Sequence, residues 1–150
     1  MDFSFQGSDN KRYHLAELTL GDYATDLPLW IQFRPYERFK LLKDKIAAQQ
    51  YETESNRLLM ECSRKNLDSN SPEVLSYLNS AEGACAVIYF SLKKNHKDIT
   101  FEQVQQLVTM KNANEVQIKI AVLSGEMGED TAKKKLETVN STKGNFTAKE

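Results

Sequence analysis

Apolar and polar residues alternate at the start of the chain. Phe3-Ser4-Phe5 alternates, as does part of the stretch from Arg12 to Leu18, and Gly7-Ser8-Asp9-Asn10 lies between them. Alternation with a period of two is typical of strands, and Gly, Asn and Asp are typical of tight turns. The pattern predicts a two-stranded N-terminal hairpin, which has to pack against helices because an isolated hairpin is only marginally stable.

A helical period follows the predicted hairpin. Thr19 can cap a helix that begins at about Leu20, with Asp22 three residues further on, and Leu18 can pack against Tyr23. A carboxylate in the first turn also suits the positive end of the helix dipole. These residues specify a helix boundary and no chemistry.

Two prolines interrupt the helical pattern that follows. The stripe formed by Tyr23, Leu27, Trp30 and Ile31 contains Pro28, which removes a backbone donor. We therefore expect a kink or two short helices at this point. Pro35 suits the first position of a helix, so a new helix can begin there.

The stretch from Tyr36 to about Lys65 consists of strong helix formers. One apolar stripe ends near Ile46, another resumes at Leu58, and the residues from Gln49 to Arg57 between them are polar apart from Tyr51. Either one helix extends beyond the core in its middle, or the chain breaks there. We favour one long helix with a solvated stretch.

The second half of the chain shows clearer helix starts. Ser71-Pro72 and the capping-box pair Asn79 and Glu82 each predict one. The apolar run from Ala84 to Phe90 fits a buried strand or a buried helix, and the small residues around it favour a central core helix. Thr100 with Gln103 predicts a further capped helix.

The last predicted core element lies just before Gly125. Val116, Ile118, Ile120 and Val122 alternate like a strand, yet a helical stripe also fits, and we favour the helix. Beyond this point large apolar residues are few, so the segment has little to bury. We predict a helical domain over 1–124 and a flexible charged tail over 125–150, with a short helix near Ala132 to Val139. The fold class is mainly α, with the N-terminal hairpin packed on a bundle of about five to six helices.

Composition limits the function. The chain has 150 residues, 20 basic and 21 acidic, and a formal net charge of −1. This balance argues against a dedicated nucleic-acid binder, which needs clustered positive charge. No apolar run approaches the ~20 residues that span a bilayer, and the N-terminus lacks the features of a signal peptide. We therefore expect a cytoplasmic protein without a membrane partner, and two cysteines, Cys62 and Cys85, that act as small buried hydrophobic residues.

Catalytic patterns are not found in the sequence. His14 and His96 have no cysteine or carboxylate at the spacing of metal ligands, and no nucleophile elbow, P-loop or dinucleotide motif occurs. The carboxylates Glu52 and Glu54 are two residues apart, so they do not face each other on a helix. We predict neither an enzyme nor a cofactor or metal site.

Four aromatic residues surround the Arg34-Pro35 junction: Trp30, Phe33, Tyr36 and Phe39. One interpretation is core packing where two helices meet. The other is a set of exposed anchors for a partner protein, since aromatic side chains contribute much of the energy of interfaces. These four residues are the candidate partner-binding site.

The order of these motifs resembles a known family. A short hairpin leads through Tyr13-His14-Leu15 to Leu18-Thr19-Leu20-Gly21-Asp22-Tyr23 and then Trp30-Ile31. An apolar helix from Ser80 to Leu92 leads to Asn95-His96-Lys97-Asp98-Ile99-Thr100-Phe101-Glu102-Gln103-Val104. This arrangement is similar to that of the tail assembly chaperones of long-tailed bacteriophages. The resemblance covers roughly residues 1–124, and its motifs are structural.

The resemblance implies a binding function. A protein of this family binds the phage tape measure protein, helps tail tube subunits polymerise around it in the host cytoplasm, and is absent from the mature virion. The polar segment from Gln49 to Arg57 and Pro28 depart from the family's pattern. The resemblance implies no cofactor, and it leaves open whether copies of the chain associate.

Two other functions compete with this one. The first is a phage structural or connector protein that stays in the virion. The second is a small helical regulator that binds nucleic acid, for which the lysines from Lys93 to Lys97, next to the helix from Thr100, are the best argument. The near-neutral net charge speaks against the regulator.

Overall fold

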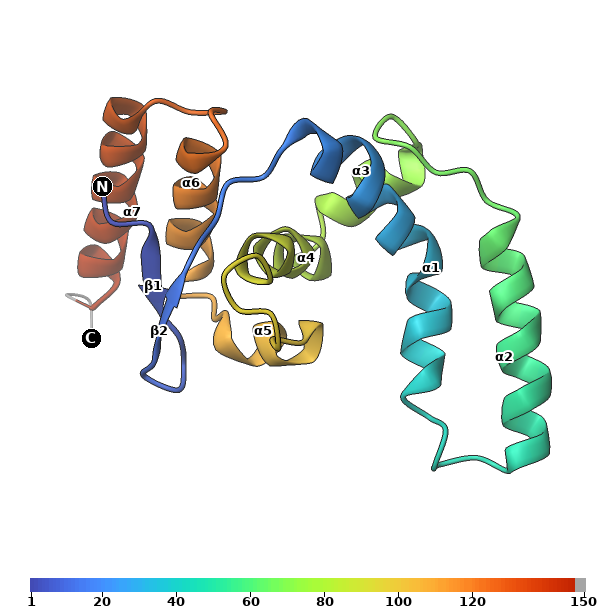
Figure 1. Cartoon of the computed structure of the whole chain (residues 1–150). Coiled ribbons are helices and arrows are strands. Elements are labelled where there is room, and N and C mark those ends of the chain that lie inside the picture. Colours follow the sequence, from blue (N-terminus) through green and yellow to red (C-terminus); the bar gives the residue numbers. More distant parts are fainter. Residues whose placement is uncertain (148–150) are drawn as a thin grey trace. The chain divides into compact units, whose positions relative to one another are not determined.

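The computed structural model describes the backbone of residues 1–147 and the side chains of residues 1–141. Its secondary structure is mainly helical, with a short antiparallel hairpin at the N-terminus (Figure 1). The predicted fold class is confirmed. In chain order the elements are β1 (Ser4–Gln6), β2 (Arg12–His14), a π-helix η1 (Asp22–Asp26), α1 (Leu27–Lys40), α2 (Ala48–Ser63), α3 (Pro72–Leu78), α4 (Ala81–Leu92), α5 (Phe101–Leu107), α6 (Ala113–Leu123) and α7 (Glu129–Thr147).

Contacts group the chain into two compact units. Unit 1 combines residues 1–19 with residues 80–150, and unit 2 comprises residues 20–79. The predicted division at residue 124 therefore differs from the observed one. In the sequence, unit 2 is inserted between the two parts of unit 1. Local composition does not reveal this division, because it depends on which helices pack together.

The hairpin of unit 1 has the predicted strands and turn. Phe5 pairs with Tyr13 in the antiparallel register, and Asn10 has a positive φ of 64° in the turn. Phe5 is buried, so the hairpin gains its stability from the helices beneath it. A Cβ atom at Gly7 would lie 2.9 Å from the Leu107 side chain on α5, so a larger residue there would require that side chain to shift.

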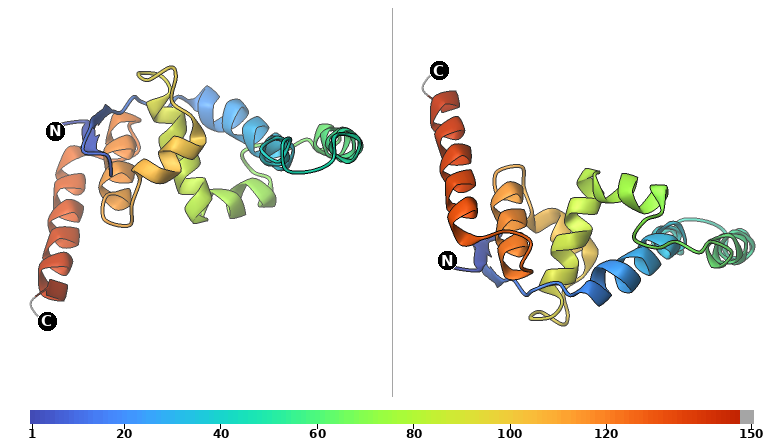
Figure 2. Two further views of the ribbon diagram at one scale, coloured as in Figure 1. Left: turned by 90° about the horizontal axis from the view of Figure 1, so that it is seen from below. Right: turned by 90° about the horizontal axis from the view of Figure 1, so that it is seen from above.

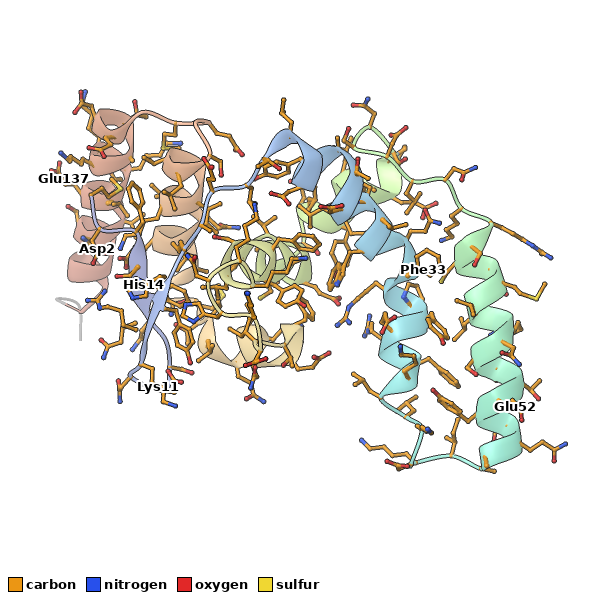
Figure 3. All side chains as sticks on the ribbon, viewed as in Figure 1. Asp2, Lys11, His14, Phe33, Glu52 and Glu137 are labelled. Atoms are coloured by element: carbon orange, nitrogen blue, oxygen red, sulfur yellow. The ribbon has the colours of Figure 1, made fainter. Side chains whose placement is uncertain are left out.

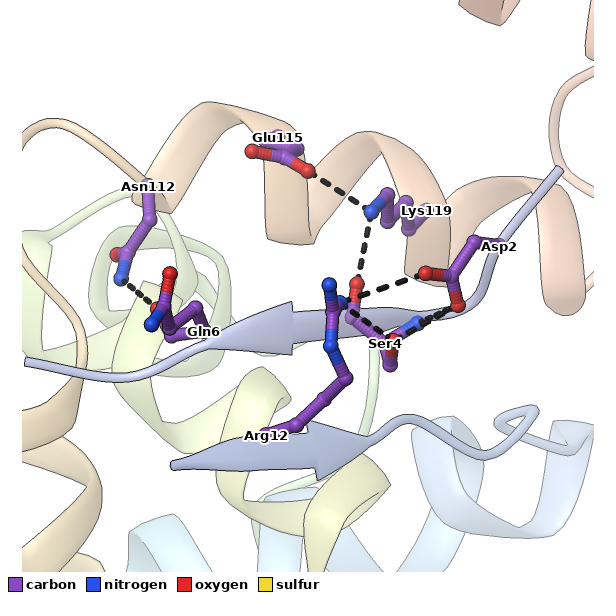
Figure 4. Close-up of polar contacts among 7 residues, drawn as sticks. All are labelled: Asp2, Ser4, Gln6, Arg12, Asn112, Glu115 and Lys119. Carbon is purple, nitrogen blue, oxygen red and sulfur yellow. Dashed lines mark hydrogen bonds and ion pairs between the residues drawn. The ribbon is translucent and has the colours of Figure 1, made fainter. Parts of the chain in front are cut away.

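A polar network attaches β1 to α6 (Figure 4). The ammonium group of Lys119, which is only 8% exposed, donates to the carbonyl of Ser4 at 2.7 Å and pairs with Glu115 at 2.8 Å. The hydroxyl of Ser4 donates to Asp2 at 2.7 Å, and this bond holds the pKa of Asp2 below its usual value. The buried ammonium is thus satisfied on both sides.

Helix α4 is the central core helix that the apolar run predicts. Ile88 and Leu92 are fully buried on it, and its N-cap is Ser80, whose hydroxyl oxygen accepts from Gly83 N–H at 3.0 Å. The expected cap at Asn79 is therefore wrong by one residue. Both hydrogen bonds of the predicted Thr100 and Gln103 capping box are present on α5.

Ser91 on α4 makes a closed polar contact with the segment after β2. Its hydroxyl donates to the carbonyl of Ala16 at 2.7 Å and accepts from the Ala16 N–H at 2.9 Å, and the side chain is fully buried. Changing Ser91→Ala leaves two backbone groups without this partner, so we expect a loss of about 1–3 kcal/mol in the free energy of unfolding. Urea denaturation measures it. The control Ser63→Ala removes an exposed hydroxyl and should cost less than about 0.5 kcal/mol; equal losses would contradict the role of Ser91.

The C-terminal segment contains a longer helix than the short one predicted. Helix α7 begins at Glu129, runs beside α6 and extends past the end of α6 (Figure 2). Its Ala132 is fully buried, and Leu136 and Val139 continue the same stripe half-buried. The segment after residue 125 therefore does not form a separate tail. The three side chains of Ala132, Leu136 and Val139 attach α7 to unit 1. The end of the predicted tail, residues 148–150, lies outside the described residues.

Unit 2 is built around α1. The helical turns begin at Leu20, as predicted, and the kink expected at Pro28 appears as a π-helical turn before α1, where the Leu27 N–H donates to the carbonyl of Asp22. Pro28 has no N–H for the preceding turn, so the change of register occurs there. No new helix begins at Pro35, which lies inside α1.

The long helix favoured for residues 36–65 is wrong. Helix α1 ends at Lys40, residues 41–47 turn, and α2 runs back along α1 from Ala48. Inside the pair, the Gln32 amide donates to the carbonyl of Cys62 at 2.9 Å and accepts from the Leu67 N–H at 3.2 Å. This buried double contact joins α1 to the end of α2, which one continuous helix would not allow.

Candidate partner-binding surface

All four predicted anchors lie on α1, and all four are half-buried. They are spaced by three residues, so each is rotated by about 60° from the last on a regular helix. Trp30 and Phe39 therefore lie on nearly opposite sides of α1. The structure does not gather the four residues into one patch.

Trp30 packs against α3. Its ring centroid is 6.1 Å from that of Tyr77, edge to face, and the guanidinium of Arg34 lies 5.0 Å from its centroid. Arg34 itself is only 8% exposed. Edge-to-face and cation–π contacts of this kind stabilise a packed corner. Trp30 therefore fits the core-packing interpretation.

Phe39 lies at the other end of α1 and contacts α2. Its ring stacks on Tyr51, with centroids 5.5 Å apart and planes 7° from parallel. The Lys40 ammonium lies 5.2 Å from the centroid of the Tyr36 ring. The hydrogen bond that Lys40 donates to Glu37 raises the pKa of Lys40. Phe33 lies on the side of α1 that faces α2 (Figure 3).

Two exposed leucines follow Phe39 in the chain. Leu41 is 59% exposed and Leu42 is 38% exposed. Both lie in turns, where the Leu41 N–H donates to the carbonyl of Arg38 and the Leu42 N–H donates to the carbonyl of Phe39. We call the apolar residues of this connection the tip cluster: Tyr36, Phe39, Leu41, Leu42, Ile46 and Tyr51. The sequence did not indicate Leu41 or Tyr51 as site residues, because a continuous helix would separate them.

Basic and acidic residues are balanced around the tip cluster. Between residues 36 and 54 the chain has four basic side chains, Arg38, Lys40, Lys43 and Lys45, and four acidic ones, Glu37, Asp44, Glu52 and Glu54. An exposed apolar cluster with a charged rim is the usual composition of a protein interface. The tip cluster can thus bind apolar surface on a partner, and its charged rim is solvated around it.

A polar hollow of about 430 Å³ lies in unit 1 between the hairpin and the start of α5. Several of its polar groups have partners within unit 1. The Tyr13 hydroxyl donates to Asp9 at 2.7 Å, which lowers the pKa of Asp9 and raises that of Tyr13, and Nε2 of His96 accepts from the His14 N–H at 3.0 Å. These contacts hold the hairpin turn in place. They do not form a pair of nucleophile and base.

Lysines in the proposed nucleic-acid stretch are engaged within unit 1. The Lys93 ammonium lies 3.6 Å from the ring centroid of Phe90, and Lys94 donates to the carbonyl of Glu17 at 2.8 Å. Cation–π and hydrogen-bond contacts of this kind draw both charges toward the protein. The best argument for a nucleic-acid regulator is therefore weakened.

The described part of the chain holds neither a metal-ligand cluster nor a helix that could span a membrane. Within residues 1–147, no three His, Cys, Asp or Glu side chains gather in a way that suits a metal ion. None of the helices in this same part of the chain combines the length and hydrophobicity needed to cross a membrane.

Comparison with known proteins adds no relative. No family model, no curated protein and no solved structure matches the chain. Its function is therefore inferred from the tip cluster and from the order of its sequence motifs.

Proposed function

We propose that this protein is a tail assembly chaperone that binds the phage tape measure protein and promotes assembly of the tail tube. The observation that supports the proposal is the tip cluster, a group of half-buried apolar residues with two exposed leucines at the end of a helix pair. The order of sequence motifs in residues 1–124, which resembles that of the chaperone family, supplies the identity of the partner.

The tip cluster suits reversible binding. Phe39 and Tyr51 hold each other in place, so little side-chain entropy is lost when a partner covers them. Leu41 and Leu42 supply apolar area that is exposed before binding. Burial contributes about 25 cal/mol per Å², from which the cost of association is subtracted. A small surface of this kind gives modest affinity per copy, and several copies can line one long partner.

The partner's chemistry follows from the surface. A long helix with an apolar stripe offers side chains at a spacing that a compact cluster can cover. A tape measure protein that is not yet enclosed by the tail tube would expose such stripes. The chaperone would cover them until the tube replaces it.

Mass spectrometry of purified phage particles tests this role. A chaperone leaves when assembly ends, so the protein should be abundant in infected cells and absent from mature virions. The tape measure and tail tube proteins serve as internal controls, since both must be detected in the same particles. Recovery of this chain in a fixed ratio to the tail tube protein would instead support a connector retained in the virion.

A further inference from the structure

A shallow groove of about 490 Å³ runs between α6 and α7 in unit 1. The residues that line the groove recur every three to four positions on α6 and again on α7, so each helix contributes one face. The two helices lie next to each other in both views of Figure 2. The groove is lined by Asn114, Gln117, Ile118, Thr131, Lys134, Lys135, Thr138 and Val139.

The floor of the groove is more apolar than polar. Ile118 and Val139 are half-buried in it, so each still presents part of an aliphatic side chain to solvent. The hydroxyl of Thr138 donates to the carbonyl of Lys134 at 3.0 Å, one turn earlier on α7. A threonine hydroxyl that bonds back to its own helix leaves the methyl group to contact other surfaces.

Positive charge lines the groove. Lys134 and Lys135 are both exposed, and no carboxylate is among the lining residues. No ion pair engages either lysine within the described part of the chain, whereas Lys40, Lys65 and Lys119 each have one. Two solvated cations beside an apolar floor favour an occupant that carries carboxylates beside apolar side chains.

We propose that the α6–α7 groove binds an acidic amphipathic helix of a partner polypeptide. The part of α7 that lines it, from Thr131 to Val139, spans about 12 Å, which corresponds to about two turns of a bound helix. Apolar side chains at positions i, i+3, i+4 and i+7 of that helix contact Ile118 and Val139. Its flanking carboxylates pair with Lys134 and Lys135. This site lies in unit 1, so it does not depend on the tip cluster or on the chaperone role.

Fluorescence anisotropy with a synthetic probe tests the groove. The probe is a fluorescein-labelled helical peptide of about four turns, with leucine at the apolar spacing and glutamate beside it. A second peptide has lysine at every glutamate position. The full-length protein should bind the acidic peptide at least about tenfold more tightly than the basic one, and added salt should reduce the difference. Equal binding of the two peptides would overturn the proposal.

Three single charge reversals locate the binding. Lys134→Glu and Lys135→Glu should each weaken binding of the acidic peptide by about tenfold or more. Lys133→Glu is the matched control: it makes the same charge change on an exposed residue of α7 that does not line the groove, and binding should stay within about twofold. Circular dichroism establishes that all three variants fold. An equal effect of all three reversals would mean that only general charge attracts the peptide.

Two further measurements separate this proposal from its alternatives. Leu41→Glu in the tip cluster should leave the preference for the acidic over the basic peptide unchanged, so failure of the chaperone role and failure of the groove are distinguishable. Sedimentation of the protein alone tests a second copy as the occupant. A dimer that Lys134→Glu abolishes would show that the groove binds another copy, and would overturn the proposal of a separate partner.

Discussion

Replacing Leu41 by glutamate is expected to weaken binding of the tape measure protein by about 10- to 100-fold and to leave the fold intact. Leu41 is 59% exposed at the tip cluster, so the change should alter the free energy of unfolding by less than about 0.5 kcal/mol. In the complex, however, the new carboxylate would be buried among apolar groups without a partner, which is strongly unfavourable. Titration of labelled protein with fragments of the tape measure protein measures the effect.

Leu75→Glu is the matched control for this prediction. Leu75 lies on α3, outside the tip cluster, and is 50% exposed, so the chemical change and the starting exposure are nearly the same. Its binding should stay within about twofold of the unchanged protein. A similar loss for both variants would show that the tip cluster has no special role.

Replacing Trp30 by alanine is expected to destabilise unit 2 by about 3 kcal/mol, the lower end of the range for tryptophan. The indole contacts Tyr77 on α3 and the guanidinium of Arg34 above its ring, so its loss opens a cavity between α1 and α3 and removes both contacts. Because Trp30 is the only tryptophan, urea denaturation should be followed by circular dichroism.

Trp30→Phe is the control for this change, because it keeps an aromatic ring against Tyr77. We expect it to lose less stability than the alanine variant, and both variants should bind the tape measure protein normally at temperatures where they are folded. Unchanged stability together with lost binding would instead place Trp30 in the partner interface.

Local patterns predicted the hairpin and the helix starts of unit 1 well. Strand alternation and turn residues predicted the hairpin, and the Thr100 and Gln103 pair predicted the start of α5, because these features depend on a few neighbouring residues. The ambiguous stretch around Val116 is a helix, as favoured, and it buries Val116 and Ile120 on one face.

The break between α1 and α2 could not be predicted in the same way. The connection around Lys43, Asp44 and Lys45 contains no glycine or proline, and the residues on either side of it are good helix formers. What opposes a continuous helix is a set of contacts between residues far apart in sequence, such as Gln32 with Leu67 and Phe39 with Tyr51. Tertiary packing overrode local propensity here.

The candidate site was predicted only in part for the same reason. The aromatic spacing indicated α1, but the partners of the rings lie on other helices: Tyr77 on α3 for Trp30, and Tyr51 on α2 for Phe39. The exposed Leu41 belongs to the site only because the chain turns there. A small residue, Ala132, similarly gave little indication that α7 packs on α6.

Calorimetric titration of the protein with a soluble segment of the tape measure protein tests the central claim most directly. If the protein acts by covering apolar helical surface, binding must show a negative heat capacity change, and Leu41→Glu must weaken the binding by about 10- to 100-fold. Absence of binding by the folded protein, or binding with no heat capacity change, would contradict the account.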